Sequence, residues 1–279
     1  MENERISYVR LFIASVKRFI FSKRYLIHLL LTFVLSSFSI QFLDAINQTS
    51  HIMPPDVFEV FKSGNKYNIG VLTVSRLDIM NEPYHDELLM GILSGSFFIC
   101  IIASLISGFI CSENKNGYVK IAITHGQSRF SLYNQYVLVS VLSSVPIIIS
   151  SLIGIVFSLS LHNMLMFRSI KNILQVLILQ AILIFFCSLC FACVAIIIKD
   201  YRAVAVCVSS VFIIPLLPGY IHIFTAGQVE LEKFFLLNQL IHSSDFVNLN
   251  VGVSILTAVV TSAIIYIVGW LCFYNCNFD

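Results

Sequence analysis

The residues best suited to chemistry or recognition lie in one short polar segment, 112–134, which reads SENKNGYVKIAITHGQSRFSLYN and is flanked by long apolar runs. The segment has one acid near its start, and two glycines, three basic residues (Lys115 among them) and two serines follow it. In chain order, the six that bear on chemistry or recognition are Glu113, Gly117, Lys120, Gly126, Ser128 and Arg129. Because glycine readily adopts the left-handed conformations that turns require, the two glycines predict a short element bounded by turns.

The residues between the two glycines favour contact with another protein. Val119, Ile121 and Ile123 alternate with other residues, among them Tyr118 and Lys120. A loop that only joined two helices could consist of a few polar residues. The alternation therefore predicts a short element pressed into a groove of a partner, and the alternative is a short interfacial helix that faces lipid headgroups.

Two other sets of residues could support chemistry, but each has a simpler explanation. Ser94 and His222 could provide a nucleophile and a base on different helices, as in an intramembrane protease. However, serine is frequent throughout the apolar segments, where it suits close helix packing. Cys187, Cys190 and Cys193 could bind a metal, but no fourth ligand is in view. We interpret the serines and the cysteines as packing residues and His222 as an anchor at the membrane interface.

The elements that position these residues are apolar. Of the 279 residues, 58% are hydrophobic and 11% are charged, which indicates an all-α integral membrane protein. One crossing of a bilayer takes about 20 apolar residues, and six segments without Asp, Glu, Lys or Arg meet this requirement. They are 25–43, 88–111, 133–161, 172–198, 203–224 and 251–274.

The distribution of basic residues predicts the orientation. If the N-terminus is cytoplasmic, eleven of the 17 Lys and Arg residues fall in cytoplasmic segments, as the positive-inside rule requires. We therefore expect both termini to be cytoplasmic, 44–87 to be an extracellular loop and 112–132 to be a cytoplasmic loop. The net charge of +2 reflects this topology and gives no indication of nucleic-acid binding.

Three segments are predicted to lie at the membrane surfaces. Residues 5–24 have an apolar face, which includes Ile13, Val16 and Ile20, and a basic face. They predict an amphipathic elbow helix along the inner headgroups, and the alternative is an extension of the first span. Residues 230–242 predict a short amphipathic segment that dips into the outer leaflet.

Two further patterns concern the extracellular side. Pro215 and Pro218 predict a bend or a break near the outer end of the fifth span. In the loop 44–87, residues 67–74 predict a strand and 56–62 a helical turn, which would form a small ordered cap. This loop is close to the lower size limit of an independent domain, so we do not expect it to be catalytic.

The absence of certain residue types from the sequence argues against several classes of function. Ion-coupled carriers use buried ionisable groups as relays, and the six apolar segments contain no Asp, Glu, Lys or Arg. The chain also lacks a phosphate-binding G-x-x-x-x-G-K-[ST] motif and has no Gly-Lys pair at all. We therefore expect no nucleotide site and no enzymatic activity in this chain. If the protein does work, the energy arrives through a partner.

The segment 112–134 resembles the loop after the second span in permease subunits of ABC-2 type ABC transporters. In that family the loop typically has an acidic residue, a Gly-Thr pair, a short coupling helix and a G-x-S-R or P-x-S-R turn. The likeness rests on Glu113, Gly117, Lys120, Gly126, Ser128 and Arg129. Tyr118 stands where the family has threonine, and Asn134 or Gln135 stands where a basic residue is frequent.

The resemblance implies how the chain would work. It would form one transmembrane domain over residues 1–279 and pair with a second copy or a paralogue. Two copies of a separate ABC ATPase subunit would bind ATP and Mg, so that this chain itself binds no cofactor. The implied coupling residues are Glu113, Gly117, Tyr118, Lys120, Ile121, Ile123, Gly126, Ser128 and Arg129.

We also assign individual roles within this loop. Glu113 is expected to cap the loop or to form a salt bridge with it. Tyr118, Ile121 and Ile123 are expected to fill the groove of the ATPase, and Arg129 to fix the turn that leads into the third span.

The expected function is export of an amphipathic or hydrophobic cargo across the cell membrane by a multi-pass permease embedded in membrane lipids. A peptide is the expected class, since the layout is similar to that of bacteriocin and lantibiotic self-protection exporters. The alternatives are an ABC exporter of a small-molecule drug or an ion, a secondary carrier, and a membrane immunity or scaffold protein that does not transport.

Overall fold

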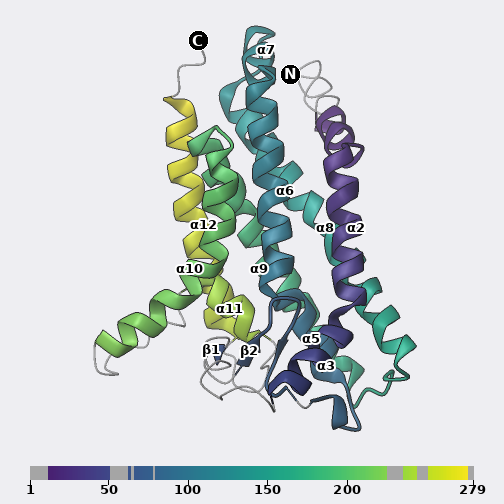
Figure 1. The fold of residues 1–279 in the computed structure, drawn as a ribbon. Coiled ribbons are helices and arrows are strands. Elements are labelled where there is room, and N and C mark those ends of the chain that lie inside the picture. Colours follow the sequence, from purple (N-terminus) through teal and green to yellow (C-terminus); the bar gives the residue numbers. More distant parts are fainter. Residues whose placement is uncertain are drawn as a thin grey trace.

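The structure is a computed structural model that describes residues 12–50, 62–63, 66–77, 79–224, 235–243 and 251–275. Long helices lie side by side in a bundle (Figure 1). The longer helices are α2 (Lys23–Ser37), α3 (Ser39–Ser50), α6 (Ser96–Lys115), α8 (Arg129–Leu161), α9 (Ile170–Ile198), α10 (Arg202–Phe224) and α12 (Val251–Tyr274). Shorter helices are α5 (Asp86–Gly91), α7 (Tyr118–Thr124) and α11 (Leu236–His242), and 3-10 turns cover Ile79–Asn81 and Ile92–Ser94.

Several of these helices are suited to a membrane. Among the described residues, four helical segments are long and apolar enough to cross one: Asp86–Lys115, Arg129–Leu161, Ile170–Ile198 and Val251–Tyr274. A fifth is added if the bent pair Phe12–Ile20 and Lys23–Ser37 forms one span. The chain is thus a helical membrane protein. Helix α10 is also apolar, but Arg202–Leu217 is shorter than these spans, so six crossings stay a prediction.

The bundle has two distinct ends (Figure 1). The α7 end carries α7, the start of α2, the turn between α9 and α10, and the end of α12. Contacts bring these segments together, because Arg24 bonds to Tyr201 and Arg129 bonds to the carbonyl of Tyr274. The sheet end carries α3, the strands, α5 and the connection from α8 to α9. Segments predicted to be cytoplasmic and extracellular therefore gather at opposite ends, and which end faces the cytoplasm stays a prediction.

The first predicted span, 25–43, is not one helix. Helix α2 ends at Ser37, and a separate helix, α3, begins at Ser39, after Phe38. Serine hydroxyls bond back to the helix at this point, from Ser37 to the carbonyl of Phe33 and from Ser39 to the carbonyl of Ser36. Such back-bonding competes with the backbone ladder and bends helices, which explains the interruption.

The second predicted span, 88–111, is also divided. Helix α5 is followed by the 3-10 turn Ile92–Ser94, and Gly95 then adopts an extended conformation before α6 begins. Gly91 and Gly95 lie against the backbone of the loop before them, since a Cβ on Gly91 would meet the Thr73 carbonyl oxygen at 2.1 Å. The approach of the loop to the helix therefore shapes this break.

The sheet end contains a small antiparallel sheet with strands β1 (Lys62–Ser63), β2 (Lys66–Asn68) and β3 (Thr73–Val74) in that order. Tyr67 pairs with Val74. Residues 67–74 were expected to form one strand, but they form a hairpin, because Gly70 turns the chain with φ = 89°. The helical turn predicted for 56–62 lies outside the described residues except for Lys62.

Three surface predictions can be compared with the structure. Phe12–Ile20 is a helix bent by 55° from α2, as expected of an elbow, while residues 5–11 lie outside the described part. Helix α10 continues through both prolines to Phe224, and Figure 1 shows its last turns leaning away from the bundle, so it bends rather than breaks. In helix α11, Leu237 and Ile241 were expected to face lipid or the other helices, and both are buried among the helices. Residues 230–234 lie outside the described part.

Candidate docking site

The short element between the two glycines is a helix, α7 (Tyr118–Thr124). Both glycines have left-handed backbone angles, with φ = 70° at Gly117 and 86° at Gly126. At its end, the amide of Gln127 bonds to the carbonyl of Ala122 and that of Gly126 to the carbonyl of Ile123. This pair of bonds is a Schellman cap, so the turns set both ends of α7 locally.

The outer surface of α7 differs from the prediction. Residues two positions apart point to different sides of a helix, so the alternating apolar residues do not form one face. Val119 and Ala122 are buried, and Ile123 packs against the core. Ile121 is 54% exposed. The exposed residues Lys120, Ile121, Thr124 and His125 form what we call the α7 outer face.

Of the three residues expected to fill a partner's groove, only Ile121 belongs to this outer face. Tyr118 is half-buried, and its ring lies beneath the guanidinium of Arg18, whose Cζ is 3.7 Å from the ring centroid. Tyr118 and Ile123 therefore fix α7 to the bundle. Ile121 is left as the apolar contact residue, beside the charge of Lys120.

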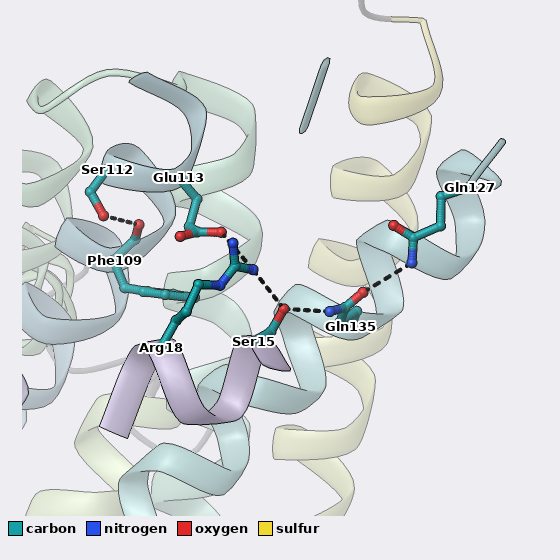
Figure 2. Close-up of polar contacts among 7 residues, drawn as sticks. All are labelled: Ser15, Arg18, Phe109, Ser112, Glu113, Gln127 and Gln135. Atoms are coloured by element: carbon teal, nitrogen blue, oxygen red, sulfur yellow. Dashed lines mark hydrogen bonds and ion pairs between the residues drawn. The ribbon is translucent and has the colours of Figure 1, made fainter. Parts of the chain in front are cut away.

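Arg18 is the centre of the contacts that hold α7 (Figure 2). It extends from the helix Phe12–Ile20, and its Nη2 lies 3.2 Å from Oε2 of Glu113 and 3.0 Å from the hydroxyl oxygen of Ser15. Glu113 lies near the end of α6 and is 8% exposed. One guanidinium thus joins the elbow, the end of α6 and the first residue of α7. Glu113 forms the salt bridge that was predicted, but with the elbow rather than the loop.

A chain of polar side chains continues from Ser15 to the turn after α7 (Figure 2). The amide nitrogen of Gln135 donates to the hydroxyl oxygen of Ser15. Gln127 donates in turn to the amide oxygen of Gln135 over 3.3 Å. Ser15 and Gln135 are buried, and buried polar groups stabilise a fold when they are paired. The elbow, α8 and the turn after α7 are therefore joined by one network.

Aromatic packing beneath the network fixes the elbow. Phe19 is 1% exposed, and its ring lies 5.2 Å from that of Tyr25 and 4.3 Å, edge to face, from that of Phe109. The hydroxyl of Tyr25 donates to the carbonyl of Ser143 over 3.1 Å. Ser15 and Phe19 lie at the centre of the buried face, whereas Ile13, which was predicted to be part of it, is 47% exposed.

The exit from α7 is held at a second point. The hydroxyl of Ser128 caps α8 by accepting a hydrogen bond from the amide of Ser131 at 3.2 Å. Arg129 donates to the carbonyl of Tyr274, the last residue of α12. The predicted role of Arg129 at this turn thus has a specific partner at the far end of the chain.

Sequence reasoning missed Arg18, Ser15 and Gln127 as members of this site. Arg18 was counted only as one of the basic residues of the elbow. Ser15 and Arg18 are three residues apart and so share one side of a helix, and that spacing was the available signal. No pattern in the sequence indicated that this side would meet Glu113 and Tyr118, since the contact depends on the bend between the elbow and α2.

The described residues also line a partly open apolar cavity of about 360 Å³ between α9, α10, α11 and α12. Phe191 and Val194 line it together with three thiols, those of Cys187, Cys190 and Cys207. Cys193 instead lies 3.2 Å from the hydroxyl of Tyr133. The cysteines of α9 therefore have packing roles, and the cavity could hold an apolar group.

The residues considered for a protease are placed differently from a nucleophile and its base. Ser94 is fully buried, and its hydroxyl donates to the carbonyl of Gly91 over 2.9 Å. It belongs to the 3-10 turn before α6, where it closes the break in the second span. The side chain of His222 lies outside the described part of the structure.

No protein-family model matches the chain, and searches of curated proteins and of solved structures likewise found no match. The function therefore has to be inferred from the site itself.

Proposed function

We propose that the protein is the permease subunit of an ATP-driven ABC exporter and that the α7 outer face is the surface on which a separate ATPase docks. The observation that carries this proposal is the construction of α7. It is a short helix with left-handed glycines at both ends, an exposed Ile121 and Lys120, and a buried side tied to the elbow and to α6.

The attachment of α7 suits the transmission of force. A partner that pushed on Ile121 would displace a helix whose buried side carries Val119 and Ala122, and whose first residue is stacked on Arg18. Arg18 bonds to the elbow and pairs with the end of α6, so the displacement would reach the membrane-spanning helices. Coupling also requires that the ATPase bind α7 with different affinities in its two states.

The composition of the spans supports the class of cargo that we propose. The helices are rich in apolar and hydroxyl side chains, and the cavity between α9, α10 and α12 is lined by carbon and sulfur atoms with only Ser210 and Thr261 as hydroxyl residues. Such surfaces favour an amphipathic or hydrophobic cargo over a hydrated ion. A peptide exported by a dimer of permeases with two ATPase copies, the cytoplasm lying at the α7 end, is the form of the function that we propose.

A site-specific photo-crosslinker at Ile121 tests this proposal in the native host. We expect ultraviolet light to link it to a protein that contains a nucleotide-binding cassette, identified by mass spectrometry. Ile149 on α8 provides the matched control, because it is 51% exposed but lies within a membrane span, and it should not link to that protein. A crosslinker at Ile121 that gives only lipid adducts would contradict the assignment.

A functional measurement separates docking from transport. Ile121→Asp should abolish the cargo-stimulated ATPase activity of the purified complex, because it places a charge in the apolar contact, while insertion into the membrane is retained. A secondary carrier would continue to transport without any ATPase, and an immunity protein would protect cells when the ATPase is inactive. Either behaviour would remove the exporter assignment.

A further inference from the structure

A second group of charged residues lies at the α7 end, away from Arg18, around the exposed ring of Tyr201 in the turn between α9 and α10. The guanidinium carbon of Arg24 and the ammonium nitrogen of Lys115 are each 5.8 Å from the centre of this ring. Arg24 also donates to the Tyr201 hydroxyl over 3.4 Å. Three elements, the start of α2, the end of α6 and the turn before α10, thus place two cations on one aromatic ring.

Within the described residues these two cations have no acidic partner. The salt bridges seen in this part of the chain join Arg18 to Glu113, Arg76 to Glu82 and Arg202 to Asp200. Neither Arg24 nor Lys115 takes part in one of these. Asp200, next to Tyr201 in sequence, also accepts a hydrogen bond from the amide of Arg202 at 2.7 Å. Its charge is therefore compensated, and the corner keeps an excess of positive charge.

An apolar strip leads away from this corner along α6. Phe97 is 41% exposed, and Cys100 and Ser104 are half-buried. Their spacing places them on the side of α6 that includes Gly108 and Lys115. His28 of α2 lies 3.0 Å from the Ser104 hydroxyl, and Cys100 bonds to the carbonyl of Val208 in α10. The strip thus runs between α2 and α10.

There is open space at Gly108, next to Arg24. A Cβ added to Gly108 would meet no atom within 4 Å, and the carbonyl of Gly108 lies 3.5 Å from Nη1 of Arg24. The corner therefore combines two converging cations, a phenol hydroxyl, unfilled space and an apolar strip. An amphiphile with an anionic head and an apolar tail is complementary to this combination.

We propose that Arg24, Lys115 and Tyr201 bind the phosphate of an anionic glycerophospholipid from the leaflet at the α7 end. Arginine forks and lysine ammonium groups donate charge-assisted hydrogen bonds to phosphate oxygens, and the hydroxyl of Tyr201 adds a third donor. One acyl chain would lie along Gly108 and Ser104, since Ser104 is eleven residues, or about 17 Å, from Lys115 along α6. This site requires only that the chain be embedded in a membrane, so it stands whether or not the protein is an exporter.

The first test uses the wild-type protein in nanodiscs that contain phosphatidylglycerol and phosphatidylcholine in equal amounts. After extraction into mild detergent, native mass spectrometry should show retained phosphatidylglycerol in excess. A phosphatidylglycerol with a diazirine in its acyl chain should crosslink to peptides of α6 around Ser104–Gly108. Equal retention of the two lipids, or crosslinks spread evenly over the lipid-facing helices, would overturn the proposal.

The second test uses variants. Arg24→Gln and Lys115→Gln keep a side-chain donor but remove the charge, and each should lower phosphatidylglycerol retention about fivefold, since one basic residue near an anionic surface is worth about that factor. Lys23→Gln is the matched control, because it removes an exposed charge from the neighbouring position. The proposal fails if Lys23→Gln lowers retention as much as the other two. If a variant does not fold, the proposal is judged by the retention of the two lipids on the wild-type protein.

Discussion

The two ends of the bundle are held together in different ways. At the α7 end, side chains from distant segments bond to one another, as Arg18 does with Glu113 and Ser15. At the sheet end, two carboxylates, those of Asp86 and Glu87, bond to backbone amides. Asp86 accepts from the amides of Arg168 and Ser169 at 2.8 and 3.2 Å.

Backbone contacts at the sheet end are also unusually close. Glu87 accepts from both the amide and the hydroxyl of Ser75, and Gly91 lies against the backbone of Thr73. At the sheet end, Gly91 and Thr73 are in direct backbone contact, which a change of side-chain rotamer cannot relieve. At the α7 end, the bonds of Arg18 can be exchanged by rotation of side chains. The comparison teaches that movement in response to a partner is easier at the α7 end, which is where we place the ATPase.

The largest effect is expected from crowding the sheet end. Gly91→Ala would place a Cβ 2.1 Å from the carbonyl oxygen of Thr73, and since this neighbour is backbone, the loop must shift. We expect a loss of about 3 kcal/mol or more in the free energy of unfolding, measured as a lower melting temperature in detergent. Gly108→Ala is the control, because it meets no atom within 4 Å. Equal melting of both variants would show that the sheet end is not tightly packed.

The next effect concerns Arg18 at the α7 end. Arg18→Ala would leave the carboxylate of Glu113 without its cation, at a cost of about 1–3 kcal/mol, since the Arg18 side chain itself is 39% exposed. Hydrogen exchange should increase in the amides of α7, which loses the stacking of Tyr118.

The matched variant combines Arg18→Ala with Glu113→Gln. Removing both charges should recover part of the lost stability, because an uncharged amide is less costly to bury than an unpaired carboxylate. If the two substitutions simply added, the ion pair would not be the connection between the elbow and α6.

A smaller loss is expected from Asp86, which ties α5 to the connection between α8 and α9. Asp86→Ala should lower stability by about 1–2 kcal/mol, as for the loss of a charged cap. Asp86→Asn keeps one acceptor and should cost less. Thermal unfolding of the two variants measures the difference, and a result in which Asn is as damaging as Ala would show that the charge, rather than the geometry, stabilises this contact.

The smallest effect is a dependence on pH at the sheet end. His85 is 6% exposed and donates its amide proton to the carbonyl of Met166. Burial lowers the pKa of His85, although the charge of Asp86 partly opposes this. Because the pKa in the folded state lies below that in the unfolded state, stability is full above the ordinary range of histidine, near 6.5, and falls as the pH drops through that value.

This pH dependence can be assigned with one variant. The melting temperature of the wild-type protein should fall between pH 7.5 and pH 5.5 by more than that of His85→Gln. The melting temperatures of the two proteins should therefore approach each other as the pH falls. Parallel curves would assign the pH dependence to other groups.

The sequence was informative where composition and turn residues act locally. The apolar segments predicted helices at 133–161, 172–198 and 251–274, which coincide closely with α8, α9 and α12. Gly117 and Gly126 marked both ends of α7 because a left-handed turn needs no tertiary contact. Ser128 and Arg129 were expected in the turn that leads into the third span, and the structure has them as the N-cap and the first residue of α8.

Prediction failed where tertiary contacts decide. Tyr118, Ile121 and Ile123 were predicted to fill a partner's groove, but on the seven-residue helix α7 only Ile121 of these three is exposed. The partner of Glu113 could not be identified, because Arg18 reaches it only through the bend after the elbow. The break between α5 and α6 depends on the loop that packs against Gly91 and Gly95. The pattern of apolar residues along the helix gives no sign of this contact.

Helix α8 has 33 residues, and at 1.5 Å per residue it is about 50 Å long. The hydrocarbon interior of a bilayer is only about 30 Å thick, so an upright α8 would extend well beyond it. Its first residue, Arg129, follows directly on the turn after α7. If the excess length lies on that side, α7 would stand clear of the headgroup layer, where a large soluble protein could approach it without first displacing lipid.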